Sequence, residues 1–198
     1  MAAGDDGLFL SADSGTTWST MATGSFAAVS IDHTGDVVMA LDRSGTVWRE
    51  DRASALRPVF SSPGSTSLAM SHDGERAVVM VPGSTLWSSE SGGSGWQALE
   101  LGSRLDLRNA WIAADGEIVA VGSSGSIVHV DTSRSVEIQF PVSTDLDAIH
   151  LGGGVGYTGG GDGKVLKTLD NGLTWTEMAQ TAPQRVLGVD QIDPAGHY

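Results

Sequence analysis

The sequence predicts an all-β protein, a single β-propeller of five four-stranded antiparallel blades. Three observations lead to this prediction: a repeat of about 40 residues, short apolar segments separated by Gly and Asp turns, and abundant glycine. Glycine accounts for 27 of the 198 residues, about twice its average share. No segment shows the apolar period of an amphipathic helix. The pattern is therefore that of a chain made of strands and tight turns.

The repeat is clearest in two segments of the form S/T-x-D-x-G-x-T-W, which are Ser11–Trp18 and Thr168–Trp175. Three weaker copies lie between them. Successive acidic positions are separated by 38, 39, 41 and 39 residues, and 41 residues lead from the last through the C-terminus to the first. The acidic positions lie at Asp13, Asp51, Glu90, Asp131 and Asp170. Five such repeats account for the chain and predict one domain, 1–198.

A second repeated segment, of the form strand, glycine turn, strand, precedes each acidic position. Its fifth copy begins at Leu187, stops at the C-terminus and continues from Gly4 at the N-terminus. We therefore expect the last blade to be shared between residues 186–198 and 1–22. Its inner strand would be C-terminal and its outer strands N-terminal, which would close the ring without an unpaired seam.

The residues of the S/T-x-D-x-G-x-T-W segments have physical roles in a tight turn. Asp accepts hydrogen bonds from backbone N–H groups a few residues on, Gly supplies a positive φ, and Trp packs its ring against the neighbouring blade. One turn made five times favours a structural device over a ligand site. The residues assigned to these turns are Asp13, Gly15, Trp18, Asp51, Glu90, Gly92, Trp96, Asp131, Asp170, Gly172 and Trp175, with one residue inserted in the third copy.

This pattern resembles the Asp-box, or BNR repeat, of sialidases, sortilin-type receptors, photosystem II assembly factors and phage tail proteins. The segment Gly159–Trp175 is most similar to the assembly-factor version. The resemblance implies a β-propeller but says little of function, because one fold hosts many activities. Sialidases resemble one another in an arginine triad that binds the substrate carboxylate, a Tyr–Glu nucleophile pair and an Asp that acts as the acid. With only Tyr157 and Tyr198 as tyrosines and no Arg-Ile-Pro-type motif, the chain is unlike them, and glycosidase activity is disfavoured.

Composition excludes several other classes. The chain has 11 basic and 24 acidic side chains, a net charge of −13, which disfavours binding to nucleic acid or to anionic membranes. The lack of cysteine excludes disulfides and thiolate zinc sites. No apolar run approaches a membrane span and no signal peptide is evident, which predicts a cytoplasmic or virion location. No catalytic, cofactor-binding or metal-binding residue is predicted.

The function predicted is that of a non-enzymatic protein-interaction or structural module. Its partners would be proteins of a larger assembly such as a phage tail, fibre or virion decoration. A lectin-like propeller that binds glycan is the first alternative, although the five inter-blade loops differ in sequence, and an assembly factor is the second. The candidate interaction surface contains Trp111, Arg104 and Arg108, because Trp and Arg are enriched at interface hot spots. The competing interpretation is that Trp111 packs between blades.

Overall fold

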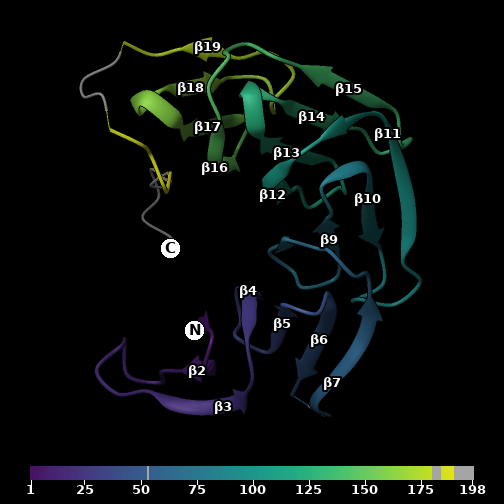
Figure 1. Cartoon of the computed structure of the whole chain (residues 1–198), viewed down its shortest axis with the longest axis vertical. Helices are drawn as coiled ribbons and strands as arrows, with labels where there is room; N and C mark the ends of the chain where they lie inside the picture. The colour runs from purple at the N-terminus through teal and green to yellow at the C-terminus, as the bar shows by residue number, and fades with distance from the viewer. Residues whose placement is uncertain (53, 180–183, 190–198) are drawn as a thin grey trace. The chain divides into compact units, whose positions relative to one another are not determined.

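Short antiparallel strands make up nearly all of the regular structure. The computed structural model describes residues 1–52, 54–179 and 184–189, and the chain divides into two compact units, Met1–Arg104 and Leu105–Tyr198. The strands form five antiparallel sheets, and Figure 1 labels most of the strands, numbered in chain order. In the described residues the helical elements are two 3-10 turns, η1 (Ser123–Gly125) and η2 (Gly161–Gly163). The all-β prediction is therefore confirmed, and no described helix could span a membrane.

Three sheets begin in the first unit, with orders β1-β2-β3, β4-β5-β6-β7 and β8-β9-β10-β11. Their strands are β1 (Ala2–Gly4), β2 (Gly7–Leu10), β3 (Ser19–Thr23), β4 (Phe26–Ile31), β5 (Val37–Asp42), β6 (Thr46–Asp51), β7 (Ser54–Ser61), β8 (Ser67–Met70), β9 (Ala77–Met80), β10 (Gly83–Ser89) and β11 (Gln97–Leu105). Each of these three sheets is a meander, in which every strand pairs with its neighbour in sequence.

The second unit holds two sheets with the same meander, β12-β13-β14-β15 and β16-β17-β18-β19. Their strands are β12 (Leu107–Ile112), β13 (Ile118–Gly122), β14 (Ile127–Val130), β15 (Val136–Gln139), β16 (Leu146–Gly152), β17 (Val155–Gly160), β18 (Val165–Thr168) and β19 (Thr176–Glu177).

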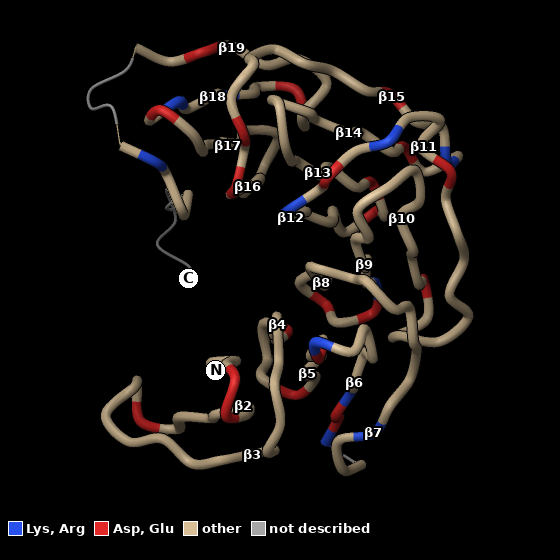
Figure 2. The backbone as a smooth tube through the Cα atoms, viewed as in Figure 1, with Lys and Arg blue, Asp and Glu red and all other residues tan. Residues whose placement is uncertain are grey.

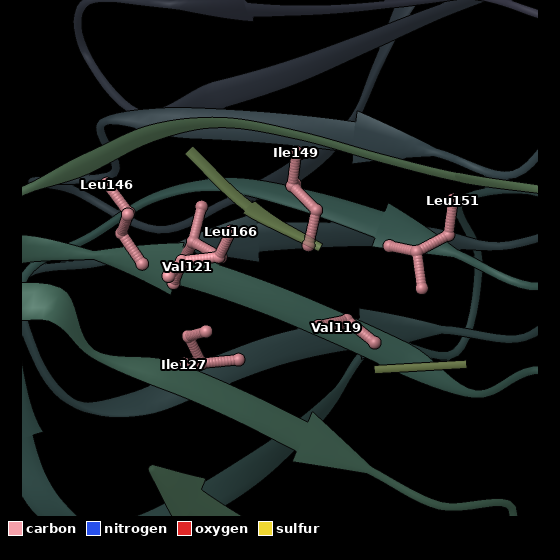
Figure 3. Close-up of a cluster of buried hydrophobic side chains, with 7 residues drawn as sticks. All are labelled: Val119, Val121, Ile127, Leu146, Ile149, Leu151 and Leu166. Atoms are coloured by element: carbon pink, nitrogen blue, oxygen red, sulfur yellow. The ribbon is translucent and has the colours of Figure 1, made fainter. Parts of the chain in front are cut away.

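In two of the sheets the second strand is buried throughout. All four residues of β9 and all five of β13 are buried. Such strands are continuous apolar runs rather than alternating ones. In the second unit a cluster of buried side chains joins the two sheets (Figure 3): Val119, Val121, Ile127, Leu146, Ile149, Leu151 and Leu166. A similar cluster of the first unit joins β5 and β6 to β8 and β9.

Three inner strands carry a β-bulge at the same position. The register shifts between Phe26 and Ala28 in β4, between Leu107 and Asn109 in β12, and between Leu146 and Ala148 in β16. The extra residues are Ala27, Arg108 and Asp147. A bulge re-aims the side chain that it carries, so Arg108 and Asp147 are directed differently from their strand neighbours.

The first sheet differs from the predicted shared blade. It has three strands, all N-terminal, where four were expected. Residues 186–189 of the expected inner strand form no strand, and residues 190–198 lie outside the described residues. Closure of a five-bladed ring therefore stays a prediction.

Gly125 is a position where the turn requires glycine. Its φ is +72°, and a Cβ there would lie 1.9 Å from the Val142 carbonyl oxygen. Gly102 has nearly the same φ, +71°, but open space around it. We expect Gly102→Ala to lower the free energy of unfolding by about 1 kcal/mol through backbone strain. Gly125→Ala should lower it by at least about 3 kcal/mol, because the carbonyl must also move.

Urea unfolding of the two variants measures this difference, with Gly102→Ala as the matched control. Equal losses of unfolding free energy in the two variants would show that the Val142 carbonyl can move at little cost. The close approach of Gly125 would then not hold the loop in place.

Candidate functional site

The two complete S/T-x-D-x-G-x-T-W turns have the same internal hydrogen bonds. Asp13 accepts the Thr17 N–H at 2.8 Å and the Thr17 hydroxyl at 2.7 Å. Asp170 accepts the Thr174 N–H at 2.8 Å and the Thr174 hydroxyl at 2.5 Å. The Thr17 hydroxyl and N–H lower the pKa of Asp13 to about 2, and the Thr174 hydroxyl likewise lowers the pKa of Asp170. Carboxylates engaged within their own turn have a structural role.

The third copy of the turn has a different register from the predicted one. The Gly93 N–H donates to Ser89 Oγ at 3.0 Å, and Trp96 Nε1 donates to the Gly93 carbonyl at 2.9 Å. The same two bonds occur in the fifth copy, from Gly172 to Thr168 and from Trp175 to Gly172. The turn glycine is thus Gly93 and not Gly92, and the predicted insertion is wrong.

Ser91 therefore stands in the acidic position that was assigned to Glu90. Glu90 instead accepts a hydrogen bond from Arg76 Nε at 2.9 Å, and the Gly92 N–H donates to the Glu75 carbonyl at 2.6 Å. Glu90 is an acidic residue next to the acidic position of the pattern, so residue type alone indicates the wrong register for this turn. The spacing from hydroxyl to Trp is the same in all three copies, and spacing is the more reliable signal.

The two remaining acidic positions also close turns. Asp131 Oδ1 accepts the N–H groups of Ser133 at 2.9 Å and Ser135 at 2.8 Å. Asp51 accepts the Ser54 hydroxyl at 2.8 Å and lies 3.3 Å from Arg57 Nη2. Neither turn has the Gly or Trp of the complete pattern.

The tryptophans of these turns differ in burial. Trp96 packs against the cluster at Met39 and stacks on Phe60, and Trp175 packs against the cluster of Figure 3. Trp18 is 50% exposed, which contradicts its expected burial. Each buried Trp packs against the sheet that precedes its own in the chain. Trp18 lies on the first sheet of its unit, which has no preceding sheet.

The predicted interaction surface is not assembled as expected. Trp111 is partly buried against the cluster of Figure 3, as the competing interpretation proposed. Arg104 is exposed near the end of β11. Arg108 alone belongs to a larger arrangement of side chains.

Arg108 is part of an ion-pair network between inner strands. Its Nη1 lies 2.8 Å from Asp147 and 2.8 Å from Asp145. Arg185 donates to both oxygens of Asp147, from Nε at 2.7 Å and from Nη2 at 2.6 Å. Figure 2 marks acidic positions on β16 and a basic one on β12. Arg108, Asp147 and Arg185 are 39 and 38 residues apart. The same position of three successive repeats therefore carries a positive, a negative and again a positive side chain.

Electrostatics keep this network ionised. The bidentate bond from Arg185 lowers the pKa of Asp147, and Arg108 lowers it further. The Ser124 N–H lowers the pKa of Asp145, again with help from Arg108. The bond to Asp147 raises the pKa of Arg108. Carboxylates held as anions are unsuited to donate protons near neutral pH.

A groove of about 720 Å³ lies beside this network in the second unit. One side is the loop that joins β15 to β16, and the other is an ion pair between Lys164 and Glu177. The Thr144 hydroxyl oxygen is buried there and has no hydrogen-bond partner in the described residues. The lining residues are Ser124, Phe140, Pro141, Val142, Ser143, Thr144, Lys164 and Glu177.

The backbone on both sides holds this loop in place. Gly125 lies against the Val142 carbonyl. The Ser124 N–H donates to the Asp145 carboxylate at 3.0 Å, and the Gly161 N–H donates to the Asp145 carbonyl at 2.7 Å. Asp145 thereby connects the groove to Arg108. The groove is built on turns that are fixed by three independent contacts.

Phe140 is an exposed apolar side chain of the groove, and two further exposed apolar residues lie near its lining residues in the chain or in the fold. Phe140 is 58% exposed, and Met178, which follows Glu177, is 43% exposed. Leu173 is 47% exposed, and its carbonyl accepts a hydrogen bond from Gln139 at 2.7 Å, which places it beside the end of β15. An exposed aromatic side chain at the edge of a partly polar groove suits contact with another macromolecule. Sequence reasoning missed these residues, because exposure is set by tertiary packing.

The described residues contain no group of three or more His, Asp or Glu side chains arranged for a metal ion.

Comparison with known proteins identifies similar solved structures but no protein family. No protein-family model matches the chain, and no curated protein matches it. Among solved structures, 819 chains match.

One similar structure is titled "YCF48 bound to D1 peptide", with 19% identity and a TM-score of 0.62. The likeness covers 83% of this chain and 58% of that one. Another is titled "Structure of U3-55K", with 12% identity, a TM-score of 0.63 and coverage of 77% and 51%. Both are β-propellers, so the fold is of β-propeller type. The chain spans little more than half of each.

The exposure of Trp18 and the burial of Trp175 predict different costs of removal. Both indoles donate a hydrogen bond to their turn glycine, at 3.2 and 3.0 Å. We expect Trp175→Ala to lower the free energy of unfolding by about 3 kcal/mol, because it leaves a cavity in the cluster. Trp18→Ala should cost about 1 kcal/mol. Urea unfolding measures both, and equal costs would mean that Trp18 is buried in solution.

The lowered pKa of Asp147 predicts a pH-dependent contribution to stability. Its folded pKa lies below the unfolded value, so the contribution is full above about pH 4 and is lost as pH falls further. We expect Asp147→Asn to be less stable than wild type by about 2 kcal/mol at pH 6, because Arg108 and Arg185 lose their anion. This difference in unfolding free energy between wild type and the variant should become smaller toward pH 2. Urea unfolding across this range measures it.

Asp6→Asn is the control for that series, because exposed Asp6 accepts no hydrogen bond from the described residues. If the stability difference between wild type and Asp147→Asn stays constant with pH, the charge of Asp147 does not explain its contribution to stability.

Proposed function

We propose that this protein is a non-enzymatic interaction module that binds an extended segment of a protein partner in the groove beside the Phe140–Thr144 loop. The observation that carries the proposal is the pairing of an open groove of about 720 Å³ with exposed Phe140 at its edge. Cavities of this size accept several side chains of a ligand. An exposed aromatic ring on a fixed loop is a typical interface anchor.

The polar groups of the groove support recognition rather than catalysis. Lys164 and Glu177 form an ion pair. Beside the groove, the Ser124 N–H and Arg108 hold Asp145 as an anion, and Arg185 and Arg108 hold Asp147 as one. General acid catalysis needs a carboxyl whose pKa is raised, and these are lowered.

One of the structural neighbours supports the same mode of action. That neighbour is described as bound to a peptide. We infer a role as a component of a larger assembly, in line with the acidic, cysteine-free composition. The phage or virion setting, the assembly-factor role, the glycan alternative and the cytoplasmic location stay predictions from the sequence.

Selection from a random peptide library tests the proposal. We expect enriched peptides to bind wild type and to lose at least about tenfold in affinity on Phe140→Asp, because the charge removes the apolar anchor. Ile31→Asp is the control, since Ile31 is 42% exposed and lies in the first unit. Urea unfolding of both variants checks that they remain folded.

Enriched peptides that bind equally well to the Phe140→Asp variant would place binding outside the groove. Failure to enrich any peptide would overturn the peptide-binding role.

A further inference from the structure

The peptide bond between Asn171 and Gly172 has the chemistry for spontaneous deamidation. In an Asn-Gly sequence the backbone nitrogen of the glycine can attack the side-chain carbonyl carbon of the asparagine, and glycine has no side chain to hinder the approach. The chain has two asparagines, Asn109 and Asn171, and glycine follows only Asn171. Asn171 is exposed, so water can reach its side-chain amide.

The backbone conformation of the turn explains why an asparagine occurs here. Asn171 has a φ of +57°, in the left-handed region that Asn adopts more readily than most residues. The residues that precede the turn glycine in the first and third copies, Ser14 and Gly92, have the same φ of +57°. Asn therefore suits the turn, but the glycine that must follow it makes its side chain reactive.

The folded turn withholds the attacking nitrogen. Gly172 is buried, and its N–H donates to Oγ1 of buried Thr168 at 2.9 Å. A Cβ on Gly172 would lie 3.0 Å from Val119, so the turn rests against the cluster of Figure 3. The nitrogen must lose its proton before it can attack. A buried, hydrogen-bonded N–H releases its proton only when the structure around it opens.

We propose that Asn171 is a deamidation site that the folded turn keeps closed, and that it reacts only in molecules in which this turn has opened. The deprotonated Gly172 nitrogen forms a bond to Asn171 Cγ, and the side-chain NH₂ takes up a proton and leaves as ammonia. Water then opens the cyclic imide at either of its carbonyls, which gives aspartate or isoaspartate at position 171. Water is the only co-reactant. The proposal is independent of the groove.

Isoaspartate prevents the turn from closing again. It adds one carbon to the backbone just before Gly172, which makes two hydrogen bonds in this turn. Its N–H donates to Thr168, and its carbonyl accepts a hydrogen bond from Trp175 Nε1 at 3.0 Å. Both bonds need the spacing of the unmodified backbone. The modification therefore converts a transient opening into a permanent loss of the turn.

Mass spectrometry of the protein during incubation at mildly alkaline pH tests the proposal. We expect Asn171 to react at least about tenfold more slowly in the folded wild type than in the urea-unfolded chain, because the reaction follows the fraction of opened turns. Thr168→Val should raise the rate in the folded protein by about tenfold, because the buried Gly172 N–H loses its partner. Thr168→Ser should keep the wild-type rate, since Ser89 has this role in the third copy.

Ser89→Ala is the matched control, because it removes the equivalent hydrogen bond to Gly93 in the first unit. It should leave the rate at Asn171 unchanged, and urea unfolding checks that each variant is folded. Hydrogen exchange of the Gly172 amide in wild type measures opening of the turn without any substitution. We expect this amide to be protected.

Four results would overturn the proposal. The first is an Asn171 that does not react even in the urea-unfolded chain, and the second is one that reacts equally fast in folded and unfolded protein. The third is a Thr168→Val variant that reacts no faster than wild type or than Ser89→Ala. The fourth is a Gly172 amide that exchanges freely in wild type, which decides the question even if Thr168→Val does not fold.

Discussion

Within each unit, the packing of one sheet against the next is the constraint on which the rest of the structure depends. A four-stranded meander of this size cannot bury enough apolar surface alone. In the second unit the cluster around Val119 and Leu166 draws side chains from both sheets, and the first unit repeats the arrangement around Met39 and Val79. These clusters bury one face of β9 and one face of β13, and every residue of both strands is buried, so their sequences are runs of apolar and small residues.

The proposed binding groove lies where this packing ends. The turns beyond the buried strands are held by close backbone contacts, such as Gly125 against Val142, and by Asp145 across to Ser124 and Gly161. Such contacts let a loop keep Phe140 exposed without losing its shape. A recognition site on fixed loops has less conformational entropy to lose on binding. The groove and the ion-pair network therefore share one rigid base.

The spacing of the repeat predicts the position of its turns correctly, whereas residue type alone predicts a wrong register in the third copy. The hydrogen bonds of Asp13 and Asp170 agree with the turn chemistry expected of them. Glu90 misled because an acidic side chain lay beside the true position, Ser91. Arg108, Asp147 and Arg185 were at the spacing of the repeat, yet their pairing requires bulges that a pattern of residue types does not reveal.

Strands, turns and the repeat of about 40 residues follow from the sequence, because they depend on contacts between residues close together in the chain. Gly supplies positive φ, Asp closes turns, and apolar runs form buried strands wherever they occur. Exposure depends instead on which sheet covers which side chain. Trp18, Trp96 and Trp175 end the same local pattern, yet Trp96 and Trp175 pack on a preceding sheet and Trp18 is half exposed. The groove beside Phe140 likewise exists only because the loop that joins β15 to β16 meets Ser124, Lys164 and Glu177, which come from other segments of the two sheets.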